Sequence, residues 1–219
     1  TRDETLKVAL MVGKILLKSG AETYRVEDTI NRFCIANGYE VDIFVTPTVI
    51  ILGNEQVDSF NCVSRIRYRT TNLGMISEMN DMSYKFERWP MSYRGTMAWL
   101  EEKLKAQVPY GKWKVCLASA IASASFSAML GGNSHDFIAA FIIGGIAMLV
   151  LKQIAGYRPS AFWENALAGV AIGVVALICC AVSVQCTMEK IIVGALMPFV
   201  PGVAFTNGLR DYMAGDLLS

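Results

Sequence analysis

The sequence lacks several motifs on which common classes of enzyme site depend. It contains one histidine, His135, no Cys-x-x-Cys spacing among its six cysteines, and no glycine-rich Lys-Ser/Thr loop for nucleotide phosphates. These absences leave no basis for predicting histidine-based catalysis, a zinc or thiol-redox motif, or a P-loop nucleotide site. We expect the cysteines to be small apolar packing residues, and we expect no metal and no cofactor.

Net charge is also nearly absent, and the charged residues are unevenly distributed. The formal charge of +1 disfavours an electrostatically driven nucleic-acid binder. Residues 1–114 contain 30 of the 39 charged side chains, whereas the remaining 105 residues contain nine. We therefore expect a soluble domain over residues 1–112, followed by a membrane domain over residues 113–219.

Four apolar segments in the second half are long enough to cross a bilayer, which takes about 17–25 residues in a helix. They cover residues 115–131, 137–155, 166–185 and 191–209. Lysines and arginines lie on the side of the N-terminal domain, whereas the turn at 132–136 has none. The positive-inside rule then predicts a multi-pass helical bundle with the N-terminal domain in the cytoplasm.

The fourth segment is interrupted in its middle by Pro198, Pro201 and Gly202. Proline lacks a backbone donor and clashes with the preceding turn, so this sequence breaks a helix. In lipid, the freed backbone groups must be buried in protein or line a cavity, which in transporters is often the substrate site. A kinked helix that only packs is the alternative interpretation.

Polar residues follow the break. Thr206 and Asn207 lie one to two turns beyond it, and Arg210, Asp211 and Asp216 lie at the expected cytoplasmic end. Charges near a membrane span are costly unless they are hydrated or paired. These residues therefore fit either a mutual ion-pair arrangement or a charged gate.

The N-terminal half is predicted to be a small α+β domain with an antiparallel sheet. Apolar residues recur at helical spacing over 6–17, Gly20 ends that helix, and Ser19 with Glu22 has the spacing of a capping box for the next. Alternating patterns predict strands at 39–45, 49–52 and 60–69, and helical patterns follow at 73–88 and 94–107.

Small residues and arginines form two further patterns. Ser119, Ser123 and Ser127 recur every four residues in the first span, which favours close helix packing, with a polar path as the alternative.

Arg65, Arg67 and Arg69 alternate along the predicted third strand, so they share one face of it. We interpret that row as the solvated face of the sheet, although it could also collect anionic headgroups.

Two motifs resemble those of the threonine/serine exporter family. They occupy residues 16–30 and residues 201–211 with 215–216, and the soluble-then-membrane layout between them agrees. The resemblance implies a bacterial inner-membrane protein that exports small metabolites. The chain is similar to the larger subunit of the split, two-protein exporters, which include a pair implicated in succinate export and whose second subunit is a short membrane protein.

The resemblance also implies a fifth membrane helix, so we expect the protein to continue beyond Ser219. We also expect residues before Thr1, which is not a start methionine. Its motifs mark two sets of candidate site residues. The first set is Glu22, Thr23, Arg25, Glu27 and Asp28, and the second is Pro201, Gly202, Thr206, Asn207, Arg210, Asp211 and Asp216.

The leading hypothesis is therefore a non-enzymatic exporter subunit for threonine, serine or a succinate-like dicarboxylate, coupled to an ion gradient. Such a protein would be a homo-oligomer or hetero-oligomer. Two other classes stay open, namely a membrane-anchored cytoplasmic enzyme of hydrolase type and a scaffold that does not transport. A pure anchor needs neither four spans nor a broken helix, and a scaffold predicts no solute flux.

Overall fold

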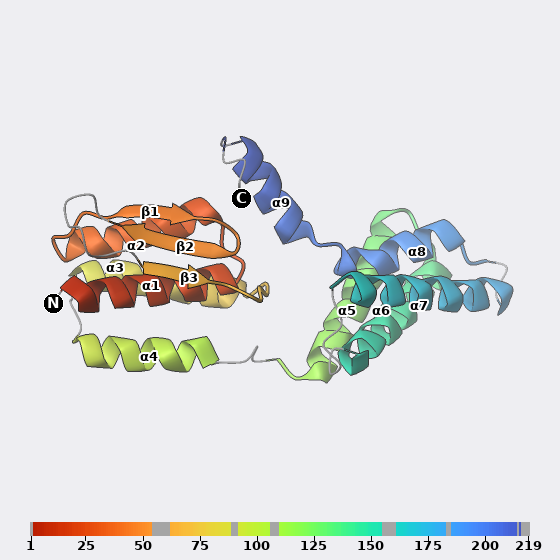
Figure 1. The fold of residues 1–219 in the computed structure, drawn as a ribbon. Coiled ribbons are helices and arrows are strands. Elements are labelled where there is room, and N and C mark those ends of the chain that lie inside the picture. The colour runs from red at the N-terminus through yellow and green to blue at the C-terminus, as the bar shows by residue number, and fades with distance from the viewer. Residues whose placement is uncertain are drawn as a thin grey trace. The chain divides into compact units, whose positions relative to one another are not determined.

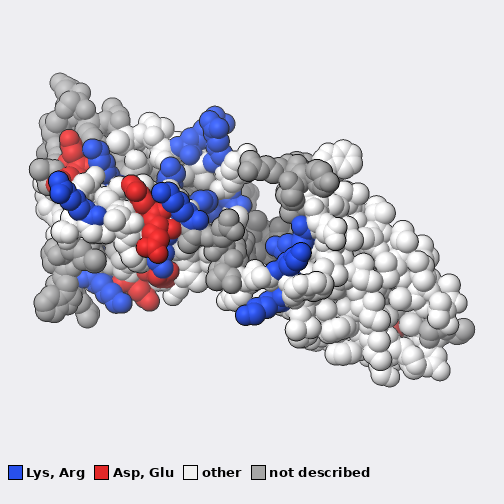
Figure 2. Space-filling model, turned by 90° about the horizontal axis from the view of Figure 1, so that it is seen from below, with Lys and Arg blue, Asp and Glu red and all other residues white. Residues whose placement is uncertain are grey.

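The computed structural model describes residues 2–53, 62–88, 92–105, 110–154, 161–182, 185–213 and 215. They form two compact units, Thr1–Val108 with Gly202–Ser219, and Pro109–Pro201 (Figure 1). The first unit carries most of the charged side chains, whereas the surface of the second has few in the view of Figure 2. The division into a cytoplasmic domain and a membrane domain at residue 112 stays a prediction.

The first unit combines helices with one three-stranded sheet, as predicted. Its strands, β1 (Asp42–Val45), β2 (Val49–Gly53) and β3 (Cys62–Arg65), pair antiparallel in the order β1-β2-β3. Its helices are α1 (Arg2–Lys18), α2 (Thr23–Ala36), α3 (Leu73–Arg88), α4 (Tyr93–Lys105) and α9 (Gly202–Met213).

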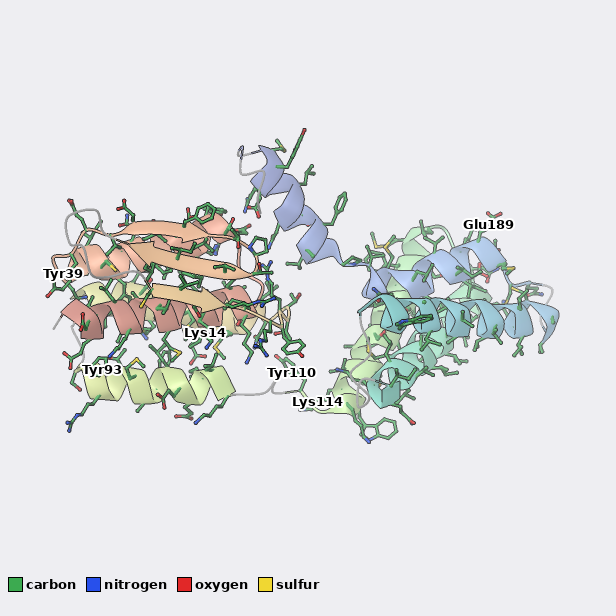
Figure 3. All side chains as sticks on the ribbon, viewed as in Figure 1. Lys14, Tyr39, Tyr93, Tyr110, Lys114 and Glu189 are labelled. Atoms are coloured by element: carbon green, nitrogen blue, oxygen red, sulfur yellow. The ribbon has the colours of Figure 1, made fainter. Side chains whose placement is uncertain are left out.

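One face of the sheet packs on the helices. Val45, Ile50 and Leu52 are buried, while Phe44 and Ile51, which are paired across β1 and β2, are exposed on the other face. This alternation is the pattern of a sheet with a single buried face. The same apolar core holds the inner faces of α1 and α2, and side chains from both helices fill the space between the layers (Figure 3).

The chain reverses between α1 and α2 at Gly20, as expected for a C-terminal glycine. Gly20 has φ +86°, the amide of Gly20 donates to the carbonyl of Leu17 at 3.2 Å, and the amide of Ala21 donates to that of Leu16 at 3.1 Å. This pair of hydrogen bonds is a Schellman motif. A Cβ at Gly20 would lie 2.9 Å from the carbonyl oxygen of Thr70, so space as well as backbone conformation favours glycine.

Two local predictions for this unit are wrong. Glu22 is itself the N-cap residue of α2 and makes no side-chain capping hydrogen bond, so no capping box joins it to Ser19. The third strand ends at Arg65 rather than continuing to Arg69. Glu22 is therefore not the glutamate of a capping box, and Arg69 is not a residue of the sheet.

The second unit is a helical bundle. It contains α5 (Lys112–Met129), α6 (Ser134–Ile154), α7 (Ala161–Val182), α8 (Met188–Leu196) and the 3-10 turn η2 (Met197–Phe199). Among its charged residues, Lys114 lies near the start of α5 and Glu189 near the start of α8 (Figure 3). Charges at helix ends can reach the membrane interface, where they cost little.

Two helices of the described chain are long and apolar enough to cross a bilayer. They are α6 and the Asn165–Val182 part of α7, and Met188–Phe199 together with Gly202–Met213 would add a third as a broken span or re-entrant loop. Helix α5 is less apolar because it begins with Lys112 and Lys114 and is rich in alanine and serine. Two to three spans are thus supported, while a fourth at 115–131 and a fifth beyond the chain end stay predictions.

The small residues of α5 allow close packing. Ser119 Oγ donates to the carbonyl of Gly144 on α6 at 3.1 Å, and a Cβ at Gly194 on α8 would lie 2.8 Å from the Ser127 amide nitrogen. Ser123 and Ser127 are fully buried. The serine row therefore lies in helix contacts, as the packing interpretation predicted, and does not line a polar path in this structure.

The predicted helix break is present. Val200 has extended backbone angles, φ −66° and ψ 127°, between the end of η2 and the start of α9. Pro201 follows it and cannot donate a backbone hydrogen bond. The apolar segment at 191–209 is therefore two helices, with α9 grouped with the first unit.

We predict that Gly144→Ala destabilises the bundle while Gly145→Ala does not. A Cβ at Gly144 would overlap the Ser123 hydroxyl, whereas at Gly145 it would make an ordinary 3.5 Å contact with Ala120. Overpacking costs about 1–3 kcal/mol, and both variants gain similar helix propensity. Thermal unfolding in detergent should separate the two variants, and equal melting temperatures would contradict the packing assignment.

We also predict that Cys34 is chemically inert in the folded protein. Burial raises the pKa of the Cys34 thiol to about 11, so at pH 8 roughly one thiol in a thousand is the reactive thiolate. Maleimide labelling followed by peptide mass spectrometry should modify Cys34 only after unfolding in denaturant. Rapid labelling of the native chain at this residue would be the contrary result.

Candidate functional site

The two sequence motifs meet where α9 lies against the start of α2. Val203, Asn207 and Asp211 are four residues apart, so they share one face of α9. Asn207 Nδ2 donates to the carbonyl of Gly20 at 3.2 Å, at the reversal between α1 and α2. The contact joins residues 187 positions apart in sequence.

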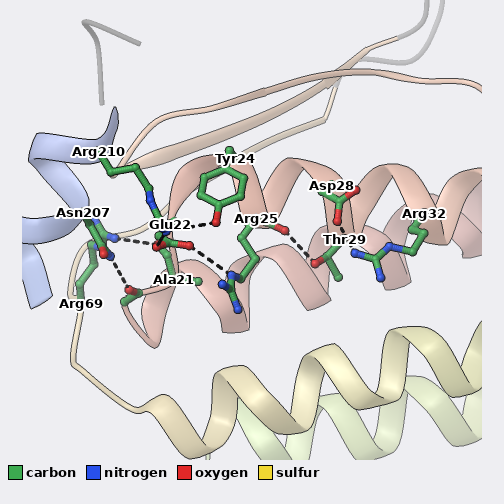
Figure 4. Close-up of polar contacts among 11 residues, drawn as sticks. Ala21, Glu22, Tyr24, Arg25, Asp28, Thr29, Arg32, Arg69, Asn207 and Arg210 are labelled. Carbon is green, nitrogen blue, oxygen red and sulfur yellow. Dashed lines mark hydrogen bonds and ion pairs between the residues drawn. The ribbon is translucent and has the colours of Figure 1, made fainter. Parts of the chain in front are cut away.

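Glu22 lies at the centre of this contact, between two arginines (Figure 4). Its Oε2 accepts a hydrogen bond from Arg25 Nε at 3.2 Å, and its Oε1 accepts one from Arg210 Nη1. The Glu22 side chain is only 15% exposed, whereas those of Arg25 and Arg210 are 43% and 56% exposed. A largely desolvated carboxylate is therefore neutralised by one arginine from each motif.

Tyr24 supports the arginine from α9. Arg210 Nη1 also donates to the Tyr24 hydroxyl at 3.2 Å, and its guanidinium carbon is 5.6 Å from the centre of the Tyr24 ring. Guanidinium groups favour such aromatic faces. Tyr24 and Glu22 together fix the direction in which the Arg210 side chain extends.

Arg69 secures the backbone beneath the site. Its Nε donates to the carbonyl of Leu17 at 3.2 Å and its Nη2 donates to that of Ala21 at 3.1 Å. Partial burial lowers the pKa of the Arg69 guanidinium, and the charge of Asp211 on α9 opposes this effect. Arg69 thus binds the backbone at the end of α1 and the turn that follows it, and its predicted place on the third strand is wrong, although its side chain is exposed as expected.

A cavity of about 130 Å³ lies beside these contacts. Its charged lining residues are Glu22 and Arg25, and Asn207 contributes an amide. The other lining residues are apolar side chains or backbone, namely Gly20, Ala21, Leu73, Ile76 and Val203. The cavity therefore offers a pair of opposite charges and an amide beside an apolar surface.

The structure brings together part of the predicted site. Glu22, Arg25, Asn207 and Arg210 are in direct contact with one another or with neighbouring backbone, and Asp211 is buried on the same face of α9. Thr206 is exposed, and its hydroxyl donates to the carbonyl of Gly202 one turn earlier in α9.

The remaining predicted residues have other surroundings. Pro201 and Gly202 are exposed at the start of α9, and Thr23 is buried at the start of α2. Glu27 accepts a hydrogen bond from the Val45 amide at 3.0 Å, which attaches α2 to β1. Asp28 pairs with Arg32 along α2, and Asp216 lies outside the described residues.

Sequence reasoning missed several residues that shape the site. Arg69 was assigned to a strand, and Leu73, Ile76 and Val203 had no marked role, because apolar residues on an amphipathic helix do not reveal which cavity they line. Tyr24 lay within the first motif, which was the one available signal for it.

The polar groups of this site can form ion pairs and hydrogen bonds with a ligand. The site supplies a carboxylate, guanidinium groups, an amide and a tyrosine hydroxyl, and none of its described residues is a cysteine or histidine. In the described chain, no group of three or more histidine, cysteine, aspartate or glutamate side chains is placed to hold a metal ion. Salt bridges and hydrogen bonds to a small polar molecule are what this arrangement can provide.

We predict that Arg69→Ala lowers stability by about 1–3 kcal/mol because two charge-assisted hydrogen bonds to backbone carbonyls are lost. Arg67→Ala is the matched control, since Arg67 is exposed two residues away. Chemical denaturation of the full chain in detergent measures both variants. Similar losses, or no loss for Arg69→Ala, would show that the carbonyl contacts contribute little.

No curated protein and no solved structure matches the chain. The model of the family described as "Putative threonine/serine exporter" (ThrE) matches residues 7–219, nearly the whole chain. Together with two to three candidate spans, this match identifies a membrane protein of transport rather than enzymatic type. The chain belongs to the threonine/serine exporter family.

Proposed function

We propose that this chain is a subunit of a secondary exporter that moves small carboxylate-bearing metabolites out of the bacterial cytoplasm across the inner membrane. A second, short membrane subunit would supply the remaining helices. Membership of the exporter family and the candidate spans support transport of a small molecule. The subunit composition, the metabolite, the inner-membrane location and the energy source all belong to this proposal.

The observation that carries the proposal is the ion pair between Arg210 and Glu22. It joins residues 188 positions apart, each from one of the two motifs. In a protein with so few charged residues in its second half, Arg210 is one of four lysines and arginines after residue 114. Its placement on a carboxylate suggests that it recognises carboxylates.

The broken helix offers a way to couple recognition of a carboxylate to transport. Helix α9 continues the apolar segment beyond Pro201 and presents Asn207 and Arg210 on its surface. We propose that a substrate carboxylate meets Arg210 on the cytoplasmic side, and that the break at Pro201-Gly202 lets α9 move relative to α8. We expect Thr206 to contribute less to substrate binding, because its hydroxyl already donates to the carbonyl of Gly202.

An ion gradient is the proposed energy source because the sequence contains no P-loop for ATP. A membrane-anchored hydrolase and a non-transporting scaffold are the competing functions, and solute flux separates both from an exporter.

We predict that Arg210→Ala lowers export at least about tenfold while the protein still inserts in the membrane, because the cation that faces the substrate carboxylate is lost. Cells expressing the full chain with its membrane partner should be loaded with labelled threonine or labelled succinate, and efflux followed at matched expression. Arg94→Ala on α4 is the control, since Arg94 is an exposed arginine outside the site.

Partner-dependent loss of one label, reduced by Arg210→Ala and retained by Arg94→Ala, is the expected result. Unchanged efflux from correctly inserted Arg210→Ala would overturn the role of this arginine. No efflux of either label from the wild-type pair would overturn export of these metabolites and favour the anchored enzyme or the scaffold.

A further inference from the structure

The three-stranded sheet carries a row of exposed apolar side chains on the face that does not pack on the helices. Phe44 on β1 is in register with Ile51 on β2, and Ile51 is in register with Val63 on β3. All three side chains are exposed, and Val63 is 65% exposed. We call this side of the sheet the outer face. A solvated sheet face is normally polar, so a continuous apolar row across all three strands indicates a surface that another molecule covers.

Two opposite charges lie at diagonal corners of the outer face. Asp42 is two residues before Phe44, and Arg65 is two residues after Val63, so strand alternation places both on this face. Strands β1 and β3 are both antiparallel to β2 and therefore run in the same direction, which puts Asp42 and Arg65 at opposite ends of the row. Both residues are exposed, and neither forms an ion pair with another residue that the structure describes.

We propose that the outer face is a contact surface for a second copy of this chain. In a dimer with two-fold symmetry, a residue that contacts a second residue across the interface is contacted by it in return. A two-fold axis between the two faces, at right angles to the diagonal from Asp42 to Arg65, places each Asp42 opposite the Arg65 of the other copy. The two ion pairs then flank the apolar row. This inference goes beyond the proposed function and does not depend on which metabolite is moved.

The packing of paired sheets agrees with this arrangement. Strands about 4.8 Å apart, with a rise of about 3.4 Å per residue, put the diagonal at roughly 35° to the strand direction. The two-fold operation then crosses the strands of the two copies at roughly 70°, which is near the orthogonal class of sheet packing. The positions of Asp42 and Arg65 therefore favour an orthogonal pair of sheets over an aligned pair.

The charges of the outer face favour a second copy over a lipid surface. On the described strands, the face has one carboxylate and one guanidinium, so its charges cancel. Anionic headgroups instead attract clusters of several lysines or arginines. An unrelated protein would need a matching pair of charges at the same spacing, whereas a second copy carries that pair already.

The outer face is small, so the contact depends on confinement in a membrane. Three strands of four or five residues cover much less than the roughly 800 Å² per partner of a standard interface. The candidate membrane spans hold both copies in one bilayer, which raises their effective concentration. We therefore expect the copies to associate when the full chain is reconstituted in a bilayer.

The test is energy transfer between two differently labelled copies of the full chain in liposomes, with charge reversal at the two corners. Asp42→Arg or Arg65→Asp alone puts like charges opposite each other in both pairs, so association should fall at least about tenfold. A chain with both changes should associate like the wild type. A mixture of the two single variants should also associate, because each variant supplies the charge that the other needs. That mixture also shows that both single variants are folded.

Reversals elsewhere in the first unit are the matched controls. Glu101→Arg and Arg94→Asp change exposed charges on α4 and should leave association unchanged. Val63→Glu puts a charge into the apolar row and should weaken association, whereas Ile35→Glu, at an exposed apolar residue of α2, should not.

Three results would overturn the inference. The first is absence of energy transfer between wild-type copies above the level expected from random proximity. The second is association of the single reversal variants at the wild-type level, which would show that the copies meet through another surface. The third is quenching by brominated lipids of a fluorophore attached at Val63→Cys, which would show that the bilayer covers the outer face.

Discussion

The pairing of the Glu22 carboxylate with arginines from both ends of the chain is the interaction on which the candidate site depends. Glu22 is largely desolvated, so it needs the opposite charges of Arg25 and Arg210. Because Arg210 is on α9, the same requirement holds α9 beside the start of α2 and forms one wall of the cavity. The start of α2 would be enough to explain a carboxylate at Glu22. Its pairing with Arg210 also places α9 next to the start of α2.

The backbone at the end of α1 makes this pairing possible. The left-handed conformation of Gly20 turns the chain so sharply that Glu22 becomes the N-cap of α2, with its side chain free of a capping bond. The carbonyls left at that turn are taken by Arg69 and Asn207. The turn at Gly20 therefore does two things. It leaves the Glu22 side chain available for ion pairing, and it presents backbone carbonyls that Arg69 and Asn207 bind.

The helical unit follows a different physical rule. Without water to drive apolar association in lipid, helices associate through close contact, which small residues such as serine and glycine allow. The contacts of Ser119 with Gly144 and of Ser127 with Gly194 supply it. The interrupted segment differs from these helices, because the extended Val200 ends the 3-10 turn η2 and Pro201 after it has no backbone donor.

The sequence by itself determined the elements: the helices and the antiparallel sheet of the first unit, the turn at Gly20, the apolar helices and the break at Pro201, because these follow from periodicity and from the backbone limits of glycine and proline. The family followed from its two motifs, which the match over residues 7–219 confirms. Only the tertiary structure decided that Glu22 faces Arg210, that Arg69 leaves the sheet, and that Thr206 points away. Contacts between residues nearly two hundred positions apart have no local signature, because any surface helix offers charges with several possible partners.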